Sequence, residues 1–193
     1  MNLVERVKHI LLTPRTEWEV IDAEPATTAG LYTGYILPLA AIGPIAQFIG
    51  YSLIGIRIPF GGGVYRTPIG SGITGAIVGY VLTLIGVYVL ALIIDGLAPS
   101  FDGTKNQIQA LKVAAYAATA GWLAGIFALI PGLRILGILG FYSLYLLYLG
   151  LPVLMKAPKE KALGYTVVVI VAAVVLAVIV SMVVGRFMMM PVG

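Results

Sequence analysis

The sequence predicts an all-α polytopic membrane protein: a bundle of five transmembrane helices preceded by amphipathic helices at the membrane interface. Composition is the first observation behind this fold class. Of 193 residues, 60% are hydrophobic and 10% are charged, whereas soluble domains average about 45–50% and about 25%. So few charges cannot cover the surface of a water-soluble domain of this size. The second observation is a set of five long apolar stretches, and the third is a different pattern in residues 1–28.

Each apolar stretch is long enough to cross a bilayer, which takes about 20 residues of helix. We expect spans at about 31–56, 70–94, 108–130, 135–155 and 164–185, within a transmembrane domain of residues 29–193. The first two spans carry no charge, and Pro38 and Pro44 should bend the first. The third contains one charge, Lys112. The fifth is rich in valine, and we expect a helix there because a single strand cannot satisfy its backbone groups in lipid.

Residues 1–28 are predicted to form a cytoplasmic segment of two amphipathic helices. A first helix over residues 2–12 separates apolar from polar side chains. The apolar face consists of Leu3, Val4, Val7, Ile10 and Leu11, and the polar face of Glu5, Arg6, Lys8 and His9. After Pro14, Thr16 and Glu19 have the spacing of a capping box, which predicts a second short helix through Asp22. Trp18 should place that helix at the level of the lipid headgroups.

Basic residues predict the orientation of the spans. One side of the membrane would carry eight of them: Arg6, Lys8, Arg15, Lys105, Lys112, Lys156, Lys159 and Lys161. The other side would carry four: Arg57, Arg66, Arg134 and Arg186. The positive-inside rule therefore places the N-terminus in the cytoplasm and the C-terminus, Gly193, outside.

The residue inventory excludes several kinds of site. The sequence has no cysteine and one histidine, His9, so thiolate nucleophiles, cysteine-based metal sites and multi-histidine metal centres are excluded. No serine is arranged with a histidine and an acid as a triad. We therefore expect no catalytic residue, no metal and no cofactor. We attribute the net charge of +4 to basic loops that lie beside anionic lipid. The expected partner is therefore the lipid bilayer, and no binding of nucleic acid is expected.

Polar residues near the cytoplasmic ends of the second and third spans form the candidate site. Asp95 ends the second span, and Gln109, Lys112 and Tyr116 form one stripe on the third. Because a short loop joins these spans, we expect Asp95 and Lys112 to pair. One interpretation is an interhelical clamp that holds the two helices in register. The other is a polar vestibule that opens to the cytoplasm and binds an ion or a lipid headgroup.

A basic cluster follows the fourth span. It consists of Lys156, Lys159 and Lys161. The cluster is a topology signal, and it is also a candidate contact for anionic headgroups at about 1 kcal/mol per residue.

Three segments carry a family resemblance. They are PRTEWEVID (14–22), QALKVAAYA (109–117) and LYLGLPVLMKAP (147–158). They resemble the Yip-one domain family of Ypt/Rab-interacting proteins, in its prokaryotic branch. The resemblance implies five spans, a cytoplasmic N-terminus and residence in the inner membrane. It implies no catalytic residues. Eukaryotic members are trafficking proteins that bind small GTPases and each other, a role that does not transfer to a prokaryotic branch on fold alone.

Two functions remain open on the sequence. The first is a non-enzymatic integral membrane protein that organises lipid, other membrane proteins or copies of itself through its N-terminus and cytoplasmic loops. The second is a small channel or permease built on the Asp95 and Lys112 vestibule. A continuous cavity reaching Gln47 and Tyr51 would favour the permease. A sealed bundle with an exposed apolar face on helix 2–12 would favour the organising role.

Overall fold

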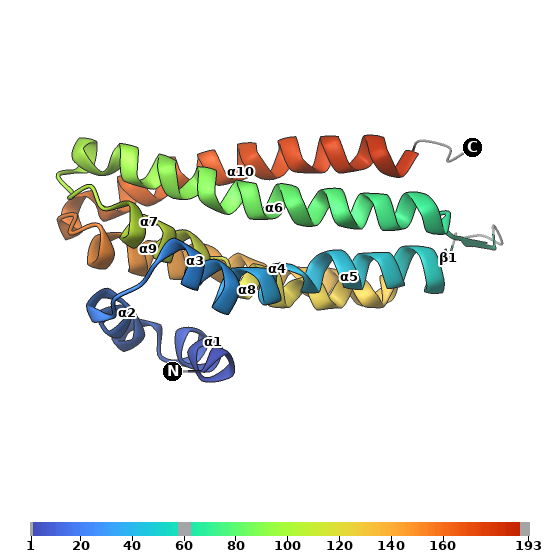
Figure 1. Ribbon diagram of the computed structural model, residues 1–193, viewed down its shortest axis with the longest axis horizontal. Coiled ribbons are helices and arrows are strands. Elements are labelled where there is room, and N and C mark those ends of the chain that lie inside the picture. The colour runs from blue at the N-terminus through green and yellow to red at the C-terminus, as the bar shows by residue number, and fades with distance from the viewer. Residues whose placement is uncertain (1, 58–62, 190–193) are drawn as a thin grey trace.

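The fold is an elongated helical bundle with two short helices packed across it near one end (Figure 1). A computed structural model describes residues 2–57 and 63–189. Five helical stretches are long and apolar enough to cross a membrane: Thr28–Ile54, Ile69–Phe101, Gln107–Leu129, Pro131–Leu154 and Lys159–Phe187. The five predicted spans are confirmed, with ends shifted by a few residues. The largest shift lies in the second span, which continues past Asp95.

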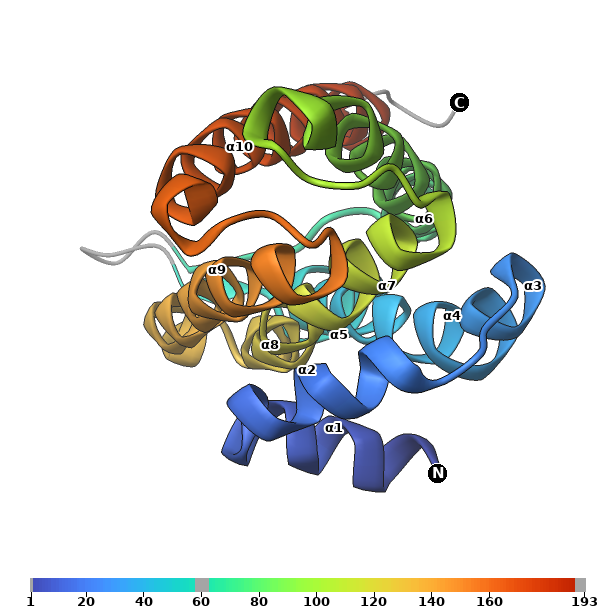
Figure 2. The same cartoon turned by 90° about the vertical axis from the view of Figure 1, so that its left-hand side faces the viewer.

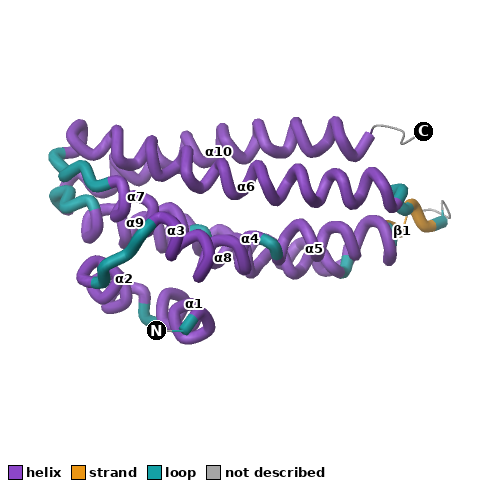
Figure 3. Tube along the Cα trace, in the orientation of Figure 1, coloured by secondary structure: helices purple, strands orange, loops and turns teal. Residues whose placement is uncertain are grey.

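The α-helices are as follows in chain order. They are α1 Leu3–Leu12, α2 Pro14–Ala23, α3 Thr28–Leu31, α4 Leu37–Ala40, α5 Ile42–Phe48, α6 Ile69–Leu97, α7 Gln107–Ala117, α8 Thr119–Ala124, α9 Tyr142–Leu154 and α10 Lys159–Met189. Short 3₁₀ segments cover Ala98–Phe101, Gly125–Leu129 and Pro131–Phe141. Strands β1 Ile56–Arg57 and β2 Val64–Tyr65 pair antiparallel, with Ile56 opposite Tyr65. Figure 3 shows how little of the bundle is not helical.

The first span is irregular, as its prolines predict. It consists of α3, a π-helical turn at Tyr32–Ile36, α4, α5 and a second π-helical turn at Ile49–Ile54. Pro38 and Pro44 provide no backbone N–H for the helical ladder, and the helix is interrupted at Ala41 between them. The span ends at Gly55, whose φ of 86° suits glycine.

The five spans form two sides of an elongated bundle. In Figure 1, α6 and α10 run along one side, and α3, α4, α5 and α8 along the other. Helix α7 is buried on almost all sides, since it packs against α6 and α9 and is rich in alanine. Much of α10 is exposed, which places its valines against lipid. The end that carries β1 and β2 lies opposite the N-terminal helices, and we refer to it as the hairpin end.

Helices α1 and α2, together the N-terminal platform, lie across the long axis of the bundle beneath α8 and α9 (Figure 2). Their buried residues Ile10, Trp18 and Ile21 belong to the same apolar core as α7 and α9. The sequence placed α1 correctly, because Leu3, Val7 and Ile10 face the bundle. Two assignments on its faces were wrong: Val4 is 75% exposed, whereas Arg6 is 5% exposed.

The start of α2 also differs from the prediction. Thr13, rather than Thr16, occupies the N-cap, and Pro14 is the first helical residue. The Thr16 hydroxyl donates a hydrogen bond to the Thr13 carbonyl at 3.1 Å. Proline is favourable at the first helical position because the N–H it lacks has no partner within the helix.

Candidate functional site

The junction between the platform and the bundle contains most of the buried polar contacts at this end of the molecule. Trp18 lies at its centre and is fully buried. A Cβ added at Gly150 would lie 2.6 Å from Cζ2 of the indole, so α9 accepts the ring only because residue 150 has no side chain. The ring edge of Trp18 also meets Tyr116, with centroids 6.3 Å apart. Trp18 therefore anchors α2 inside the protein instead of facing the headgroups, and contact of α2 with the membrane stays a prediction.

Arg6 forms the second anchor. Its guanidinium is hydrogen-bonded and ion-paired with both Glu17 and Glu24, and it lies over the ring of Tyr116, 5.6 Å from the centroid. Burial by itself lowers the pKa of Arg6, but the hydrogen bond to Glu24 and the negative charges nearby outweigh burial and raise that pKa above its usual value. The side chains of Arg6 and Glu17 are both 6% exposed. The pair is thus a charged cluster held inside the junction.

Lys112 holds the end of α2. Its ammonium donates hydrogen bonds to the carbonyls of Ile21 at 2.8 Å and Glu24 at 2.5 Å. Carbonyls at a helix C-terminus lack partners within the helix and carry partial negative charge, so a lysine is favourable there. One turn earlier on α7, the Gln109 amide donates to the carbonyl and carboxylate oxygens of Asp22 at 3.1 and 2.9 Å. Both side chains act on α2 from the bundle.

The structure brings three of the four predicted site residues together. Gln109, Lys112 and Tyr116 lie on one face of α7, and that face contacts α2. The predicted pair between Asp95 and Lys112 was wrong: the ion pairs among the described residues do not include it. Lys112 faces the platform, whereas next to Asp95 the Ile94 carbonyl accepts a hydrogen bond from Tyr165 of α10. One carboxylate oxygen of Asp95 is buried without a partner among the described residues.

The predicted basic cluster is divided between two partners. Lys156 pairs with Asp22 of α2 at 2.5 Å, and Lys161 pairs with Asp102 at 2.5 Å. Lys159 is exposed at the start of α10. Contact of the cluster with anionic lipid stays a prediction, and Lys159 is the member most available for it.

Sequence reasoning missed Arg6, Glu17 and Glu24. A signal for Arg6 was present, because it lies three residues from Leu3 and four from Ile10 and therefore within the apolar stripe of α1. A charge in such a stripe is seldom buried without a partner. The two glutamates had no comparable signal, since no motif or apolar stripe singled out Glu17 or Glu24.

The geometry predicts that Lys112 and Asp95 act independently. Lys112→Met leaves the carbonyls of Ile21 and Glu24 without their donor, at a cost of about 1–3 kcal/mol of stability. Asp95→Asn should add its own effect to within about 0.5 kcal/mol, because the two side chains share no partner. Thermal unfolding in detergent of the two single variants and the double variant measures the coupling. A coupling energy above about 1 kcal/mol would restore the predicted pair.

Comparisons with known proteins agree with this architecture. The Yip1 domain matches residues 8–182. The inner membrane protein YohC of Escherichia coli (strain K12) is 33% identical over 158 residues, which cover 79% of this chain and 80% of YohC. The protein of the same name from Escherichia coli O6:H1 (strain CFT073) gives the same identity and coverage. No solved structure matches the chain significantly. With most of its length matched, the chain belongs to the Yip1 domain family of membrane proteins.

Proposed function

We propose that this chain is a non-enzymatic protein of the inner membrane that organises membrane partners through its N-terminal platform. One observation carries the proposal. The platform is fixed to the bundle by Trp18, by the Arg6 and Glu17 pair and by Lys112, so α1 presents a defined outer surface instead of a mobile tail. His9, the single histidine of the sequence, also lies in this platform. Its Nδ1 is 3.5 Å from the Oε2 carboxylate oxygen of Glu17.

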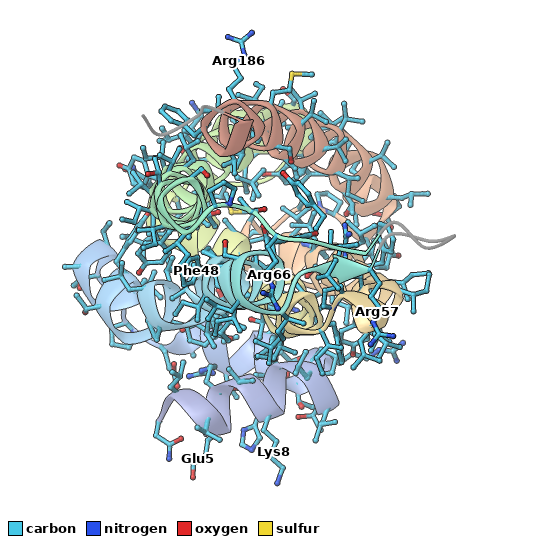
Figure 4. All side chains as sticks on the ribbon, turned by 90° about the vertical axis from the view of Figure 1, so that its right-hand side faces the viewer. Glu5, Lys8, Phe48, Arg57, Arg66 and Arg186 are labelled. Atoms are coloured by element: carbon cyan, nitrogen blue, oxygen red, sulfur yellow. The ribbon has the colours of Figure 1, made fainter. Side chains whose placement is uncertain are left out.

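The outer surface of α1 combines apolar and charged side chains. Val4 and Leu12 are 75% and 70% exposed, and Glu5 and Lys8 point away from the bundle between them (Figure 4). Because the helix is held in one position, these side chains form a fixed surface, and a partner can bind such a surface without the entropic cost of ordering it. Because the helix lies across the bundle axis, this surface is available to a neighbouring membrane protein, or to a second copy, at the interface of the bilayer.

Photo-crosslinking tests the proposal. A photoreactive residue at Val4 should form a discrete protein adduct in native membranes, and the adduct should disappear when Trp18→Ala releases the platform. A matched probe at Val174, which is 55% exposed on α10, should give lipid adducts. If Val4 gave only lipid adducts, α1 would be an interfacial anchor and the partner proposal would be contradicted.

The orientation of the chain gives a separate prediction. The eight-to-four division of basic residues places the platform and Lys159 in the cytoplasm and the C-terminus outside. Gly193 itself lies outside the described residues. Reporter fusions after residue 193 and within 156–158 should report opposite sides of the membrane. A cytoplasmic signal from the C-terminal fusion would reverse the orientation and refute a cytoplasmic platform.

The second candidate function is the small channel or permease, and two separate hollows, instead of one continuous cavity, lie along its path. One, of about 410 Å³, is lined by Lys112, Tyr116 and residues of the segment 24–31. The other, of about 600 Å³, reaches Gln47 and Tyr51 toward the hairpin end. They share no lining residue in the described part of the chain. Tyr35 of the first span is hydrogen-bonded to Thr119 of the third span at 2.6 Å. Along these two spans, both residues lie between the residues that line the two hollows, so conduction requires this contact to open. Ion flux in proteoliposomes would favour the permease.

A further inference from the structure

The hairpin end carries positive charge that the described residues do not neutralise. All eight acidic residues precede residue 25 or lie at Asp95, Asp102 and Glu160, toward the opposite end of the bundle. Four arginines lie toward the hairpin end: Arg57, Arg66, Arg134 and Arg186 (Figure 4). None of them takes part in an ion pair among the described residues. Among residues 2–57 and 63–189, these arginines therefore have no carboxylate partner, and an anion from outside can bind them.

Two adjoining hollows lie toward this end, and Arg134 lines one of them. The cavity of about 600 Å³ extends between α5, α6 and α10 and is lined largely by small residues, including Gly72, Gly75 and Ala76 of α6. A second hollow of about 550 Å³ is lined by Arg134. The two share the lining residues Gln47, Tyr51, Gly121 and Gly125. A combined site of this kind has an apolar interior and a basic edge.

The polar groups around the shared lining are arranged for a headgroup. The Arg134 guanidinium lies over the Tyr51 ring, 5.2 Å from its centroid, which orients it across the mouth of the hollow. Gln47 is an amide side chain one turn earlier on the same span, exposed to the hollow. An arginine fork matches phosphate oxygens well, and polar groups at membrane depth need a partner.

We propose that the two hollows bind one anionic phospholipid, with its phosphate at Arg134 and one acyl chain between α5, α6 and α10. This inference does not rest on the function proposed for the platform, since the site lies at the other end of the bundle. The cavity has the right chemistry for an acyl chain because small residues leave apolar space instead of filling it. Its volume falls within the range of about 300–1,000 Å³ usual for small-molecule sites.

The chain contains its own probe of the site. It has two tryptophans: Trp122 lines the cavity, and Trp18 is sealed inside the junction. Phosphatidylglycerol with brominated acyl chains should quench Trp122 fluorescence in the detergent-solubilised protein, and Trp122→Phe gives the background from Trp18. Both lipids bring a phosphate to Arg134, but phosphatidylcholine also brings an ammonium that the arginines of this end repel. We therefore expect half-maximal quenching by phosphatidylglycerol at a concentration about tenfold lower than for brominated phosphatidylcholine.

Matched variants separate a built site from lipid that merely surrounds the protein. Arg134→Gln should remove the tenfold preference, whereas Arg186→Gln, which removes the same charge from a side chain pointing away from the bundle (Figure 4), should retain it. Ala76→Phe should fill the cavity and abolish quenching, whereas Ile77→Phe on the lipid-facing side of α6 should not; Ile77 is 58% exposed.

Four results would overturn the proposal. One is equal quenching by the anionic and zwitterionic lipids in the unaltered protein. Another is quenching that Ala76→Phe leaves unchanged, which would place the lipid outside the cavity. The third is displacement of the brominated lipid by millimolar inorganic phosphate alone, which would indicate an anion site without an acyl site. A stable dimer whose formation prevents quenching would assign the hollows to a second copy of the chain.

Discussion

Replacing Trp18 with alanine is expected to weaken the docking of the N-terminal platform by about 3–5 kcal/mol. The indole is fully buried and contacts both α9 and Tyr116, so its removal leaves a cavity at the centre of the junction. Thermal unfolding in detergent, with protease sensitivity of residues 3–23, measures the loss. Val20→Ala is the control, because Val20 is 45% exposed on the same helix and should change stability by less than about 0.5 kcal/mol.

The reciprocal change at Gly150 tests the same contact from α9. A methyl group there would lie 2.6 Å from the indole, so Gly150→Ala forces either the ring or the helix to move, at about 1–3 kcal/mol. In the Trp18→Ala background this clash is absent. Gly150→Ala should then cost far less, and the two substitutions should be strongly non-additive. Additive losses would show that Trp18 and Gly150 are not in contact.

The second large effect is expected at the buried pair of Arg6 and Glu17. Arg6→Met leaves Glu17 without its partner in a site where its side chain is 6% exposed, and breaking a buried pair in this way costs about 3–5 kcal/mol. Replacing both residues with apolar ones removes the unpaired charge. The double variant, Arg6→Met with Glu17→Leu, should therefore be markedly more stable than Arg6→Met alone.

Two controls define that experiment. Glu5→Gln removes a carboxylate that points away from the bundle (Figure 4) and should have little effect. Glu24→Gln should cost less than Glu17→Gln, because the Glu24 side chain is 41% exposed and water already screens its charge. If the double variant were less stable than Arg6→Met, the charge on Glu17 would be stabilised by groups other than Arg6.

Features of the fold that depend on local composition could be predicted from the sequence. The five spans followed from apolar length alone, since the bilayer permits few alternatives to a helix. Residues Gln109, Lys112 and Tyr116 were correctly placed on one face, because helical spacing determines which side chains share a face. The interruption of the first span between its prolines followed from their missing N–H groups, whereas its two π-helical turns were not predicted.

Features that depend on which elements meet could not be predicted in the same way. A short loop joins α6 to α7, and this proximity in sequence favoured a pair between Asp95 and Lys112. The actual partner of Lys112 is the end of α2, some 90 residues away: its bond to the Ile21 carbonyl spans 91 positions. Trp18 was assigned to the lipid interface from its average preference, and nothing local indicated that Gly150 leaves space for the ring.

Helices α1 and α2 are fixed to the bundle, and a distance measured between two spin labels tests this attachment most directly. The chain contains no cysteine, so cysteines introduced at Val4 and Lys159, both exposed, provide labelling sites without further changes. Pulsed electron paramagnetic resonance in lipid nanodiscs should give one narrow distance distribution, and Trp18→Ala should broaden it. A broad distribution in the protein with Trp18 intact would contradict the account, because it would mean that the platform moves freely relative to the bundle.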